Sequence, residues 1–158
     1  MTEDLEGGCA CGAVRYRLTD TPLFVHCCHC TRCQRETGAA FAVNAMIETG
    51  KVELKLGAPK RYEVPTASGA GQAILRCEAC GTALWSHYGA ARDAVAFVKV
   101  GTLDDANAAP PDIHIFTSTR LPWVNIPDGV PVMKAFYRRS EYWPKDAIAR
   151  YDAAREER

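Results

Sequence analysis

The sequence predicts a single domain that is mainly β, on three observations. Short runs of alternating apolar and polar residues, such as the one from Val14 to Leu18, recur along the chain. Glycine and proline separate these runs. No helical pattern of about 10–15 residues stands between successive strands, as a parallel α/β fold would require. The length of 158 residues suits one domain with a real hydrophobic core.

We expect eight or nine short strands. The earlier ones lie at residues 14–18, 23–27, 39–47, 51–56 and 61–64. The later ones lie at residues 72–76, 82–87, 94–100 and 113–116. The alanines in residues 39–47 leave a helix open for that segment. Residues 34–38 allow at most one helical turn, because Gly38 ends it.

The chain changes character near its end. From Pro144 onward, apolar residues follow helical spacing, at Ala147, Ile148, Tyr151 and Ala154. We therefore predict a β-rich domain at residues 1–140 and a short C-terminal helical extension at residues 141–158.

Charge and hydropathy limit the classes of partner and the cellular compartment that we expect for this protein. Nineteen basic residues balance nineteen acidic ones, so no overall field favours nucleic acid or an anionic membrane, and we expect neither as a partner. No apolar run approaches the ~18 residues of a transmembrane helix. The acidic start at residues 1–6 lacks the apolar core of a signal peptide. We therefore expect a cytoplasmic protein, in which cysteines stay reduced or bind metal.

The eight cysteines fall in tight clusters. Their even number permits disulfides, but the chain is large for a disulfide scaffold and close pairs favour metal. The densest stretch is residues 26–35, where Cys28, Cys30 and Cys33 form C-x-C-x-x-C and can place three thiolates around one ion. Zinc suits such a thiolate-rich site, while spacing alone leaves iron open.

Two cysteine pairs stand apart from this stretch. Cys9 and Cys11 form a C-x-C flanked by glycines, and Cys77-x-x-Cys80-Gly81 has the form of a zinc knuckle. Each pair supplies two ligands and needs two more. We therefore predict one closed, structural zinc site made by both pairs, which would tie the N-terminal strand to the middle of the chain. In the alternative, Cys9 and Cys11 are small buried residues.

Three protein ligands at Cys28, Cys30 and Cys33 leave one tetrahedral position undefined. That position is either open to substrate or closed by a histidine or by Cys27. On a strand, Cys27 and Cys28 point to opposite faces, so one ion is not expected to take both. We therefore expect Cys27 to be a small buried residue.

The order of these motifs resembles a known family. The pattern Gly-Cys9-x-Cys11-Gly, Cys28-His29-Cys30-x-x-Cys33 and Cys77-x-x-Cys80-Gly81 is similar to the glutathione-dependent formaldehyde-activating enzyme (GFA) family, also called the CENP-V/GFA domain. Residues 113–116 and Pro122-Trp123 resemble its later motif, so the likeness covers roughly residues 5–127 and supports residues 1–140 as a zinc-binding CENP-V/GFA domain.

The resemblance implies a fold and two zinc ions per chain. The fold would be a β-tent of twisted antiparallel sheets around a structural zinc. The ligands of that zinc would be Cys9, Cys11, Cys77 and Cys80. The ligands of the second, catalytic zinc would be Cys28, Cys30 and Cys33. This division agrees with the one that spacing predicts.

The ligand set favours thiol chemistry at the second site. Three thiolates around Zn²⁺ carry a net charge of −1, which weakens the metal as a Lewis acid, so hydrolysis by bound water is not the first expectation. A substrate thiol in the fourth position suits a sulfur-rich site, would lose its proton there and would attack an aldehyde. The resemblance implies addition of glutathione to formaldehyde. We therefore expect a carbon–sulfur lyase-type enzyme, like S-(hydroxymethyl)glutathione synthase, acting in either direction on a small-molecule thiol and an aldehyde. The competing class is a zinc-stabilised binding module without catalysis.

Residues beside the ligands have expected roles too. Arg32 and Arg35 are candidates for binding the carboxylates of the thiol substrate, and the alternative is that both lie on a solvated face. His29 stands between two ligands and is expected to point away from the metal. Two histidines on strands are expected to be buried and hydrogen-bonded, His87 and His114. Trp123 is expected in the core.

Overall fold

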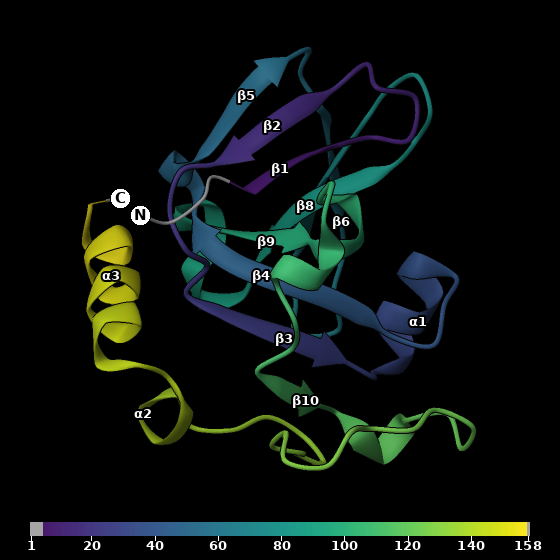
Figure 1. Cartoon of the computed structure of the whole chain (residues 1–158), viewed down its shortest axis with the longest axis vertical. Helices are drawn as coiled ribbons and strands as arrows, with labels where there is room; N and C mark the ends of the chain where they lie inside the picture. Colours follow the sequence, from purple (N-terminus) through teal and green to yellow (C-terminus); the bar gives the residue numbers. More distant parts are fainter. Residues whose placement is uncertain (1–4, 158) are drawn as a thin grey trace.

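The computed structural model describes residues 5–157 and contains two sheets. The smaller sheet has the order β1-β2-β5, with β1 (Leu5–Gly8), β2 (Arg15–Leu18) and β5 (Val52–Leu56). The larger sheet has the order β10-β3-β4-β9-β8-β7-β6. Its strands are β10 (Ile113–Ile115), β3 (Phe24–Cys28), β4 (Ala42–Glu48), β9 (Val95–Lys99), β8 (Ala83–Tyr88), β7 (Gln72–Arg76) and β6 (Lys60–Val64). The predicted mainly β fold with a C-terminal helix is confirmed, and its strands form two sheets (Figure 1).

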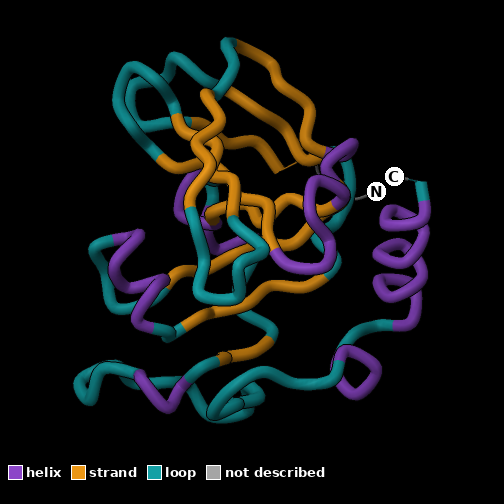
Figure 2. Tube along the Cα trace, turned by 180° about the vertical axis from the view of Figure 1, so that it is seen from behind, coloured by secondary structure: helices purple, strands orange, loops and turns teal. Residues whose placement is uncertain are grey.

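Helices lie at the periphery of the strands (Figure 2). The α-helices are α1 (Thr31–Thr37), α2 (Arg139–Tyr142) and α3 (Lys145–Glu156). The short 3-10 helices are η1 (Thr49–Lys51), η2 (Gly89–Ala94), η3 (Val100–Thr102), η4 (Ala106–Ala108) and η5 (Thr117–Thr119). Within residues 5–157, no helix has both the length and the apolar character needed to cross a membrane.

One hydrophobic cluster fills the space between the two sheets. The alternation predicted for β2 is confirmed, because Val14, Tyr16 and Leu18 are all buried. Tyr16 meets Trp85 of β8 edge to face, with ring centroids 5.8 Å apart. Gly7 of β1 lies so close to this cluster that a Cβ atom there would stand 2.5 Å from the carbonyl oxygen of Thr102. The backbone of β1 therefore packs closely against that of η3, just before the first cysteine pair.

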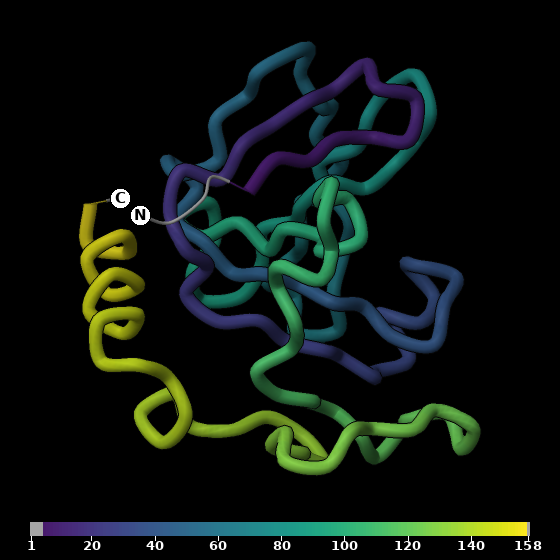
Figure 3. Tube along the Cα trace, viewed as in Figure 1, coloured from purple at the N-terminus to yellow at the C-terminus, as the bar shows by residue number. Residues whose placement is uncertain are grey.

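A second hydrophobic cluster joins the C-terminal segment to the opposite face of the large sheet. Trp143 stacks on Phe24 of β3 at 5.4 Å between ring centroids, and Ala147 and Tyr151 of α3 are buried in the same cluster. Figure 3 shows this segment running from below β10 up the side of the sheet. Residues on both sides of position 140 thus contribute to shared packing. The division at residues 1–140 and 141–158 stays a prediction.

Three local expectations differ from the structure. β10 pairs in parallel with β3, so the large sheet is not wholly antiparallel, because the chain crosses from β9 to the far edge before forming β10. β1 was not expected, since Leu5-Glu6-Gly7-Gly8 shows no clear alternation. Trp123 is 71 % exposed rather than in the core, because the chain around it belongs to no strand or helix that would bury its ring.

Candidate metal centres

The four cysteines of the two separate pairs come together in one cluster. Cys9 and Cys11 follow β1, and Cys77 and Cys80 lie in the turn between β7 and β8. The four sulfur atoms all lie within 4.8 Å of one another. The sulfur atoms of Cys9 and Cys11 lie 3.6 Å apart, and those of Cys11 and Cys77 lie 3.8 Å apart. A tetrahedral zinc with Zn–S bonds of ~2.3 Å places its sulfur ligands about 3.8 Å apart, so this donor set fits zinc.

Local hydrogen bonds favour the thiolate form of two of these four cysteines, Cys9 and Cys80. The backbone N–H of Val14 donates to the sulfur of Cys9 at 3.3 Å. The side chain of Thr82 lies 3.1 Å from the sulfur of Cys80, and this hydrogen bond contributes most to lowering the pKa of Cys80 to about 5. The left-handed backbone of Gly81, with φ of 77°, closes the turn that presents this sulfur. The cluster therefore resembles a site prepared for a cation.

The second cluster is local in sequence. Cys28 ends β3, Cys30 caps the start of α1 and Cys33 lies in the first turn of that helix. The three sulfur atoms lie within 4.8 Å of one another. The sulfur of Cys30 accepts a hydrogen bond from the backbone N–H of Cys33 at 3.3 Å, which explains why α1 begins at Thr31, earlier than expected. Cys28 is buried, but Cys30 and Cys33 are half-buried, so the cluster reaches the surface.

Charge in this three-cysteine cluster concentrates on Cys30. The neighbouring thiols of Cys28 and Cys33 donate toward its sulfur, and the backbone N–H groups of Cys33 and Arg32 add to this, so the pKa of Cys30 is lowered. The hydrogen bond with Cys30 raises the pKa of Cys28, and hydrogen bonds with Cys28 and Cys30 raise the pKa of Cys33. The three donors are soft and close enough to hold one thiophilic cation, so the residues fit the second zinc that was predicted.

A third group lies on the opposite face of the same strand. Cys27, His29 and His114 of β10 are all buried, and their potential ligand atoms lie within 4.8 Å of one another. His29 Nε2 lies only 2.8 Å from His114 Nδ1 and 3.6 Å from the sulfur of Cys27. Two nitrogen ligands of a tetrahedral zinc, with bonds of ~2.0–2.1 Å, would stand about 3.3 Å apart. The two imidazoles are therefore described best as a hydrogen-bonded pair.

This histidine pair is neutral near pH 7. Burial and the neighbouring His114 and Arg120 lower the pKa of His29 to about 4, and burial lowers the pKa of His114 as well. Because its Nε2 meets His114, His29 points away from the three-cysteine cluster, as expected, and it is fully buried. The sequence could have shown that Cys27 and His29 share one face of a strand, opposite to Cys28. Nothing in the sequence indicated that His114 would lie beside them. His87 of β8 is also buried, and its Nδ1 lies 2.8 Å from the carbonyl oxygen of Val95.

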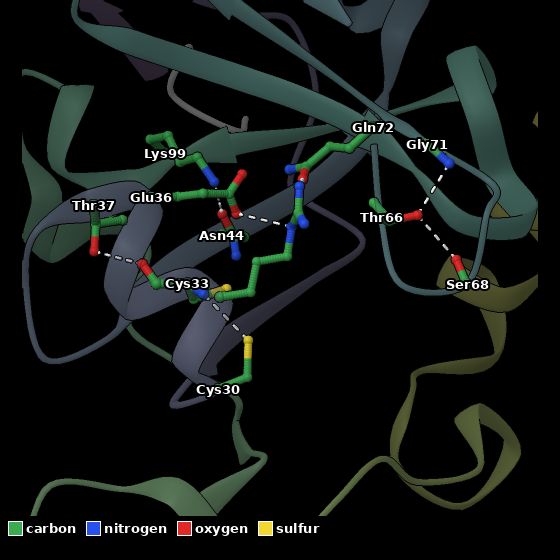
Figure 4. A network of polar contacts seen from close by, with 11 residues as sticks. Cys30, Cys33, Glu36, Thr37, Asn44, Thr66, Ser68, Gly71, Gln72 and Lys99 are labelled. Carbon is green, nitrogen blue, oxygen red and sulfur yellow. Dashed lines mark hydrogen bonds and ion pairs between the residues drawn. The ribbon is translucent and has the colours of Figure 1, made fainter. Parts of the chain in front are cut away.

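The two arginines beside the cluster are in different situations. The guanidinium of Arg32 donates from Nε and Nη2 to Gln72 Oε1, both at 3.2 Å, and its Nε lies 3.6 Å from Glu36 Oε2. Figure 4 shows this network beside Cys30 and Cys33. Arg35 is exposed on the same helix. Both arginines are therefore exposed, but Arg32 also has protein partners in Gln72 and Glu36.

Sequence reasoning missed a lysine close to this cluster. Lys99 ends β9 and pairs in register with Asn44 of β4, whose Oδ1 accepts a hydrogen bond from the lysine ammonium at 2.8 Å. Burial lowers the pKa of Lys99, while the thiols of Cys33 and Cys28 and the carboxyl of Glu36 act in the opposite direction. A single lysine at the end of the apolar run Val95-Ala96-Phe97-Val98 was the only sequence signal.

Comparison with known proteins places the chain in a family. A crystal structure of a Rhodobacter sphaeroides protein is similar over 81 % of this chain and 98 % of its own, with 19 % sequence identity and a TM-score of 0.48. The family model described as "Glutathione-dependent formaldehyde-activating enzyme" matches residues 4–119, which is well over half of the 158 residues. The resemblance noted from the cysteine motifs is thereby confirmed, and the chain belongs to the GFA family.

Proposed function

We propose that this protein is a zinc-dependent enzyme of the carbon–sulfur lyase type, which adds a glutathione-like thiol to an aldehyde such as formaldehyde, or catalyses the reverse reaction. The observation that carries the proposal is the three-cysteine cluster, which reaches the surface in a chain of the GFA family. Two zinc ions per chain belong to the proposal. The structural ion takes Cys9, Cys11, Cys77 and Cys80, and the catalytic ion takes Cys28, Cys30 and Cys33. We place the protein in the cytoplasm, where thiols remain reduced.

The proposed reaction balances without an oxidant or reductant. A carbon–sulfur bond forms between the thiol and the aldehyde carbon, the carbonyl π bond breaks, and the thiol proton ends on the oxygen. A zinc ion held by the three cysteines would supply Lewis acidity that keeps a ligating substrate thiol deprotonated at neutral pH. The half-buried positions of Cys30 and Cys33 support access of such a thiol from the surface.

The protein's own residues orient this site. The N-cap geometry of Cys30, with its sulfur accepting from the backbone N–H of Cys33, fixes the loop between β3 and α1. Gln34 Nε2 and Thr119 Oγ1 both donate to the carbonyl oxygen of His29 at 2.9 Å, which holds the loop from its other side. A loop held in this way keeps its three sulfurs arranged before a substrate arrives, which lowers the cost of binding.

The test combines metal binding with kinetics. In cobalt-substituted protein, added glutathione should strengthen the thiolate-to-cobalt charge-transfer bands. Zinc-loaded protein should accelerate formation or breakdown of the hemithioacetal, measured by NMR exchange against the uncatalysed background, with free thiol determined in each sample. Correction for free thiol matters because a protein that only binds glutathione lowers its free concentration.

The matched control is Cys30→Ser, which should stay folded and lose both the spectral change and the acceleration. If wild-type protein at saturating thiol shows neither effect, the enzyme proposal is wrong for this substrate. That outcome would favour a zinc-stabilised binding module.

A further inference from the structure

The outer strands of the two sheets differ in how far their edges are covered. These strands are β1 and β5 in the small sheet, and β10 and β6 in the large one. An isolated backbone bridge joins Gly7 of β1 to Leu103, and another joins His114 of β10 to Val132. Among residues 5–157, β5 pairs with β2 alone and β6 pairs with β7 alone. The edges that the described chain leaves without backbone pairing are therefore those of β5 and β6.

The edge of β5 is the more apolar of these two. Leu54 and Leu56 of β5 are 42 % and 57 % exposed. The large exposed apolar residue of β6 is Tyr62, and the ammonium of Lys60 lies over its ring, 5.6 Å from the centroid. Figure 1 shows β5 as the outermost strand of the small sheet. An unpaired strand with exposed leucines is a template for pairing with a further strand unless its charges prevent this.

The charges of β5 favour pairing with a second copy of the same strand. Glu53 and Lys55 stand on either side of Leu54, and the lysine ammonium lies 3.6 Å from the carboxylate. When two copies pair antiparallel about Leu54, Glu53 stands opposite Lys55 of the partner subunit, and this happens twice. Opposite charges in directly opposed positions of two strands attract, whereas like charges repel. A lone lysine at this edge would repel its own copy, but this pair of charges attracts it.

The backbone of β5 is oriented for the same pairing. The carbonyl oxygen of Lys51 accepts a hydrogen bond from the N–H of Thr19, so it points toward the β2 side. Backbone polar groups alternate in direction along a strand, so those of Val52 and Leu54 point to the free edge. Leu54 pairs with the buried Tyr16, and the register with β2 shifts beyond this pair. A second strand centred on Leu54 would therefore exchange two hydrogen bonds there and extend the apolar layer.

We propose that β5 is a dimerisation strand, which pairs antiparallel with β5 of a second copy of this chain about a two-fold axis at Leu54. The two small sheets then form one continuous sheet in the order β1-β2-β5-β5-β2-β1. A two-fold interface needs a surface that is complementary to itself, and the sequence Val52-Glu53-Leu54-Lys55-Leu56 has this property in both charge and apolar character. The inference is independent of the proposed function, because no residue of β5 belongs to a cysteine cluster.

Sedimentation velocity of the full chain over a concentration series tests the dimer. Wild-type protein should show a monomer–dimer equilibrium. Lys55→Glu places glutamate opposite glutamate at both positions, and Glu53→Lys places lysine opposite lysine. Each variant alone should raise the dissociation constant about 10-fold or more. An equimolar mixture of the two variants should dimerise again, because every opposed pair then regains opposite charges. Loss of folding could not produce this rescue.

A matched control addresses the other free edge. Glu63→Lys in β6 would place like charges opposite each other in a pairing of two β6 strands about Tyr62, and it should leave the dissociation constant unchanged. If Glu63→Lys dissociates the dimer and Lys55→Glu does not, the interface is β6 and the assignment is wrong. A wild-type chain that stays monomeric throughout the series, or a mixture that fails to dimerise, also overturns the proposal.

A wild-type measurement keeps the proposal testable even if a charge variant fails to fold. Hydrogen exchange is compared at concentrations below and above the dissociation constant. The amides of Val52 and Leu54 should exchange more slowly in the concentrated sample, since they are bonded across the interface only in the dimer. The amides of β6 should exchange at the same rate in both samples. Equal exchange of the β5 amides at the two concentrations would contradict the assignment.

Discussion

The two cysteine clusters use the same ligand type in opposite ways. The four-cysteine cluster joins a loop after β1 to a turn between β7 and β8, segments more than sixty residues apart, as the Cys11–Cys77 contact shows. The three-cysteine cluster closes within one short loop and a helical turn, from Cys28 to Cys33. A metal in the first cluster therefore ties distant parts of the fold together, and a metal in the second mainly organises its own loop.

This difference in connectivity suggests that one cluster stabilises the fold and that the other carries the chemistry. A crosslink between distant segments removes much conformational freedom from the unfolded chain, whereas a local one removes little. The local cluster is also the one with only three cysteine ligands, which leaves a fourth tetrahedral position for a substrate. We infer that the first cluster stabilises the fold and that the second is where substrate acts.

The largest expected effect is that of Cys77→Ser. Structural zinc contributes about 10–16 kcal/mol in small peptides, which is comparable with the ~5–15 kcal/mol of total stability of a domain. The variant should therefore be unfolded or insoluble, as judged by far-UV circular dichroism and thermal unfolding. Cys30→Ser is the matched control and should stay folded. Equal thermal stability of the two variants would remove the proposed distinction between the clusters.

Metal removal should produce a smaller, stepwise effect. Fresh reduced protein should contain two zinc ions per chain. A chelator should first remove one equivalent, from the three-cysteine cluster, because it offers one protein ligand fewer than the four-cysteine cluster, with far-UV circular dichroism unchanged. The second equivalent should leave together with the folded signal. A single phase in which both ions and the fold are lost at once would contradict this order, and one zinc ion or none in fresh protein would contradict the count.

The buried histidine pair gives an intermediate test on the other face of β3. In His114→Phe, His29 Nε2 loses its hydrogen-bond partner, which should cost about 1–3 kcal/mol of unfolding free energy, measured by urea denaturation. His114→Asn, whose amide reaches the Nδ1 position, should recover part of this. Zinc content should stay at two in both variants. Loss of one metal equivalent in His114→Phe would instead make the pair a set of ligands.

The cysteine motifs carried most of what the sequence predicted. The pairs Cys9–Cys11 and Cys77–Cys80 each supply only two of the four ligands that a tetrahedral metal needs, which indicated one shared cluster. The structure brings these four sulfurs together. That they bind zinc stays a prediction. The alternation at residues 14–18 placed a buried face correctly, because period-2 patterns report burial directly.

The features missed depend on segments that meet only in the folded chain. The pair formed by His29 and His114 and the hydrogen bond from Lys99 to Asn44 each join residues far apart in sequence. The parallel pairing of β10 depends on the path of the crossing connection after β9, which no local pattern encodes. Trp123 looked like a core residue by type alone, yet its segment joins no sheet.

The smallest expected effect compares one threonine at each cluster. Thr82 lies with its hydroxyl 3.1 Å from the sulfur of Cys80 and also accepts from the backbone N–H of Ala10 at 3.2 Å. Thr37, beside the other cluster, donates to the backbone carbonyl of Cys33 at 2.7 Å and bonds no sulfur among the described residues. Only Thr82 therefore stabilises a thiolate directly.

Thr82→Val should consequently raise the pH at which the four-cysteine cluster releases half of its zinc. The Thr82 side chain contributes most to holding the pKa of Cys80 at about 5, so its loss raises that pKa and lets protons displace the metal at a less acidic pH. Release is followed with a zinc indicator during acidification, in a Cys30→Ser background so that only this cluster contributes. Thr37→Val in wild-type protein should leave release from the three-cysteine cluster unchanged. If Thr82→Val does not shift release, or both variants shift it equally, hydrogen bonding to sulfur is not what distinguishes the two clusters, and the difference between them lies in chain connectivity alone.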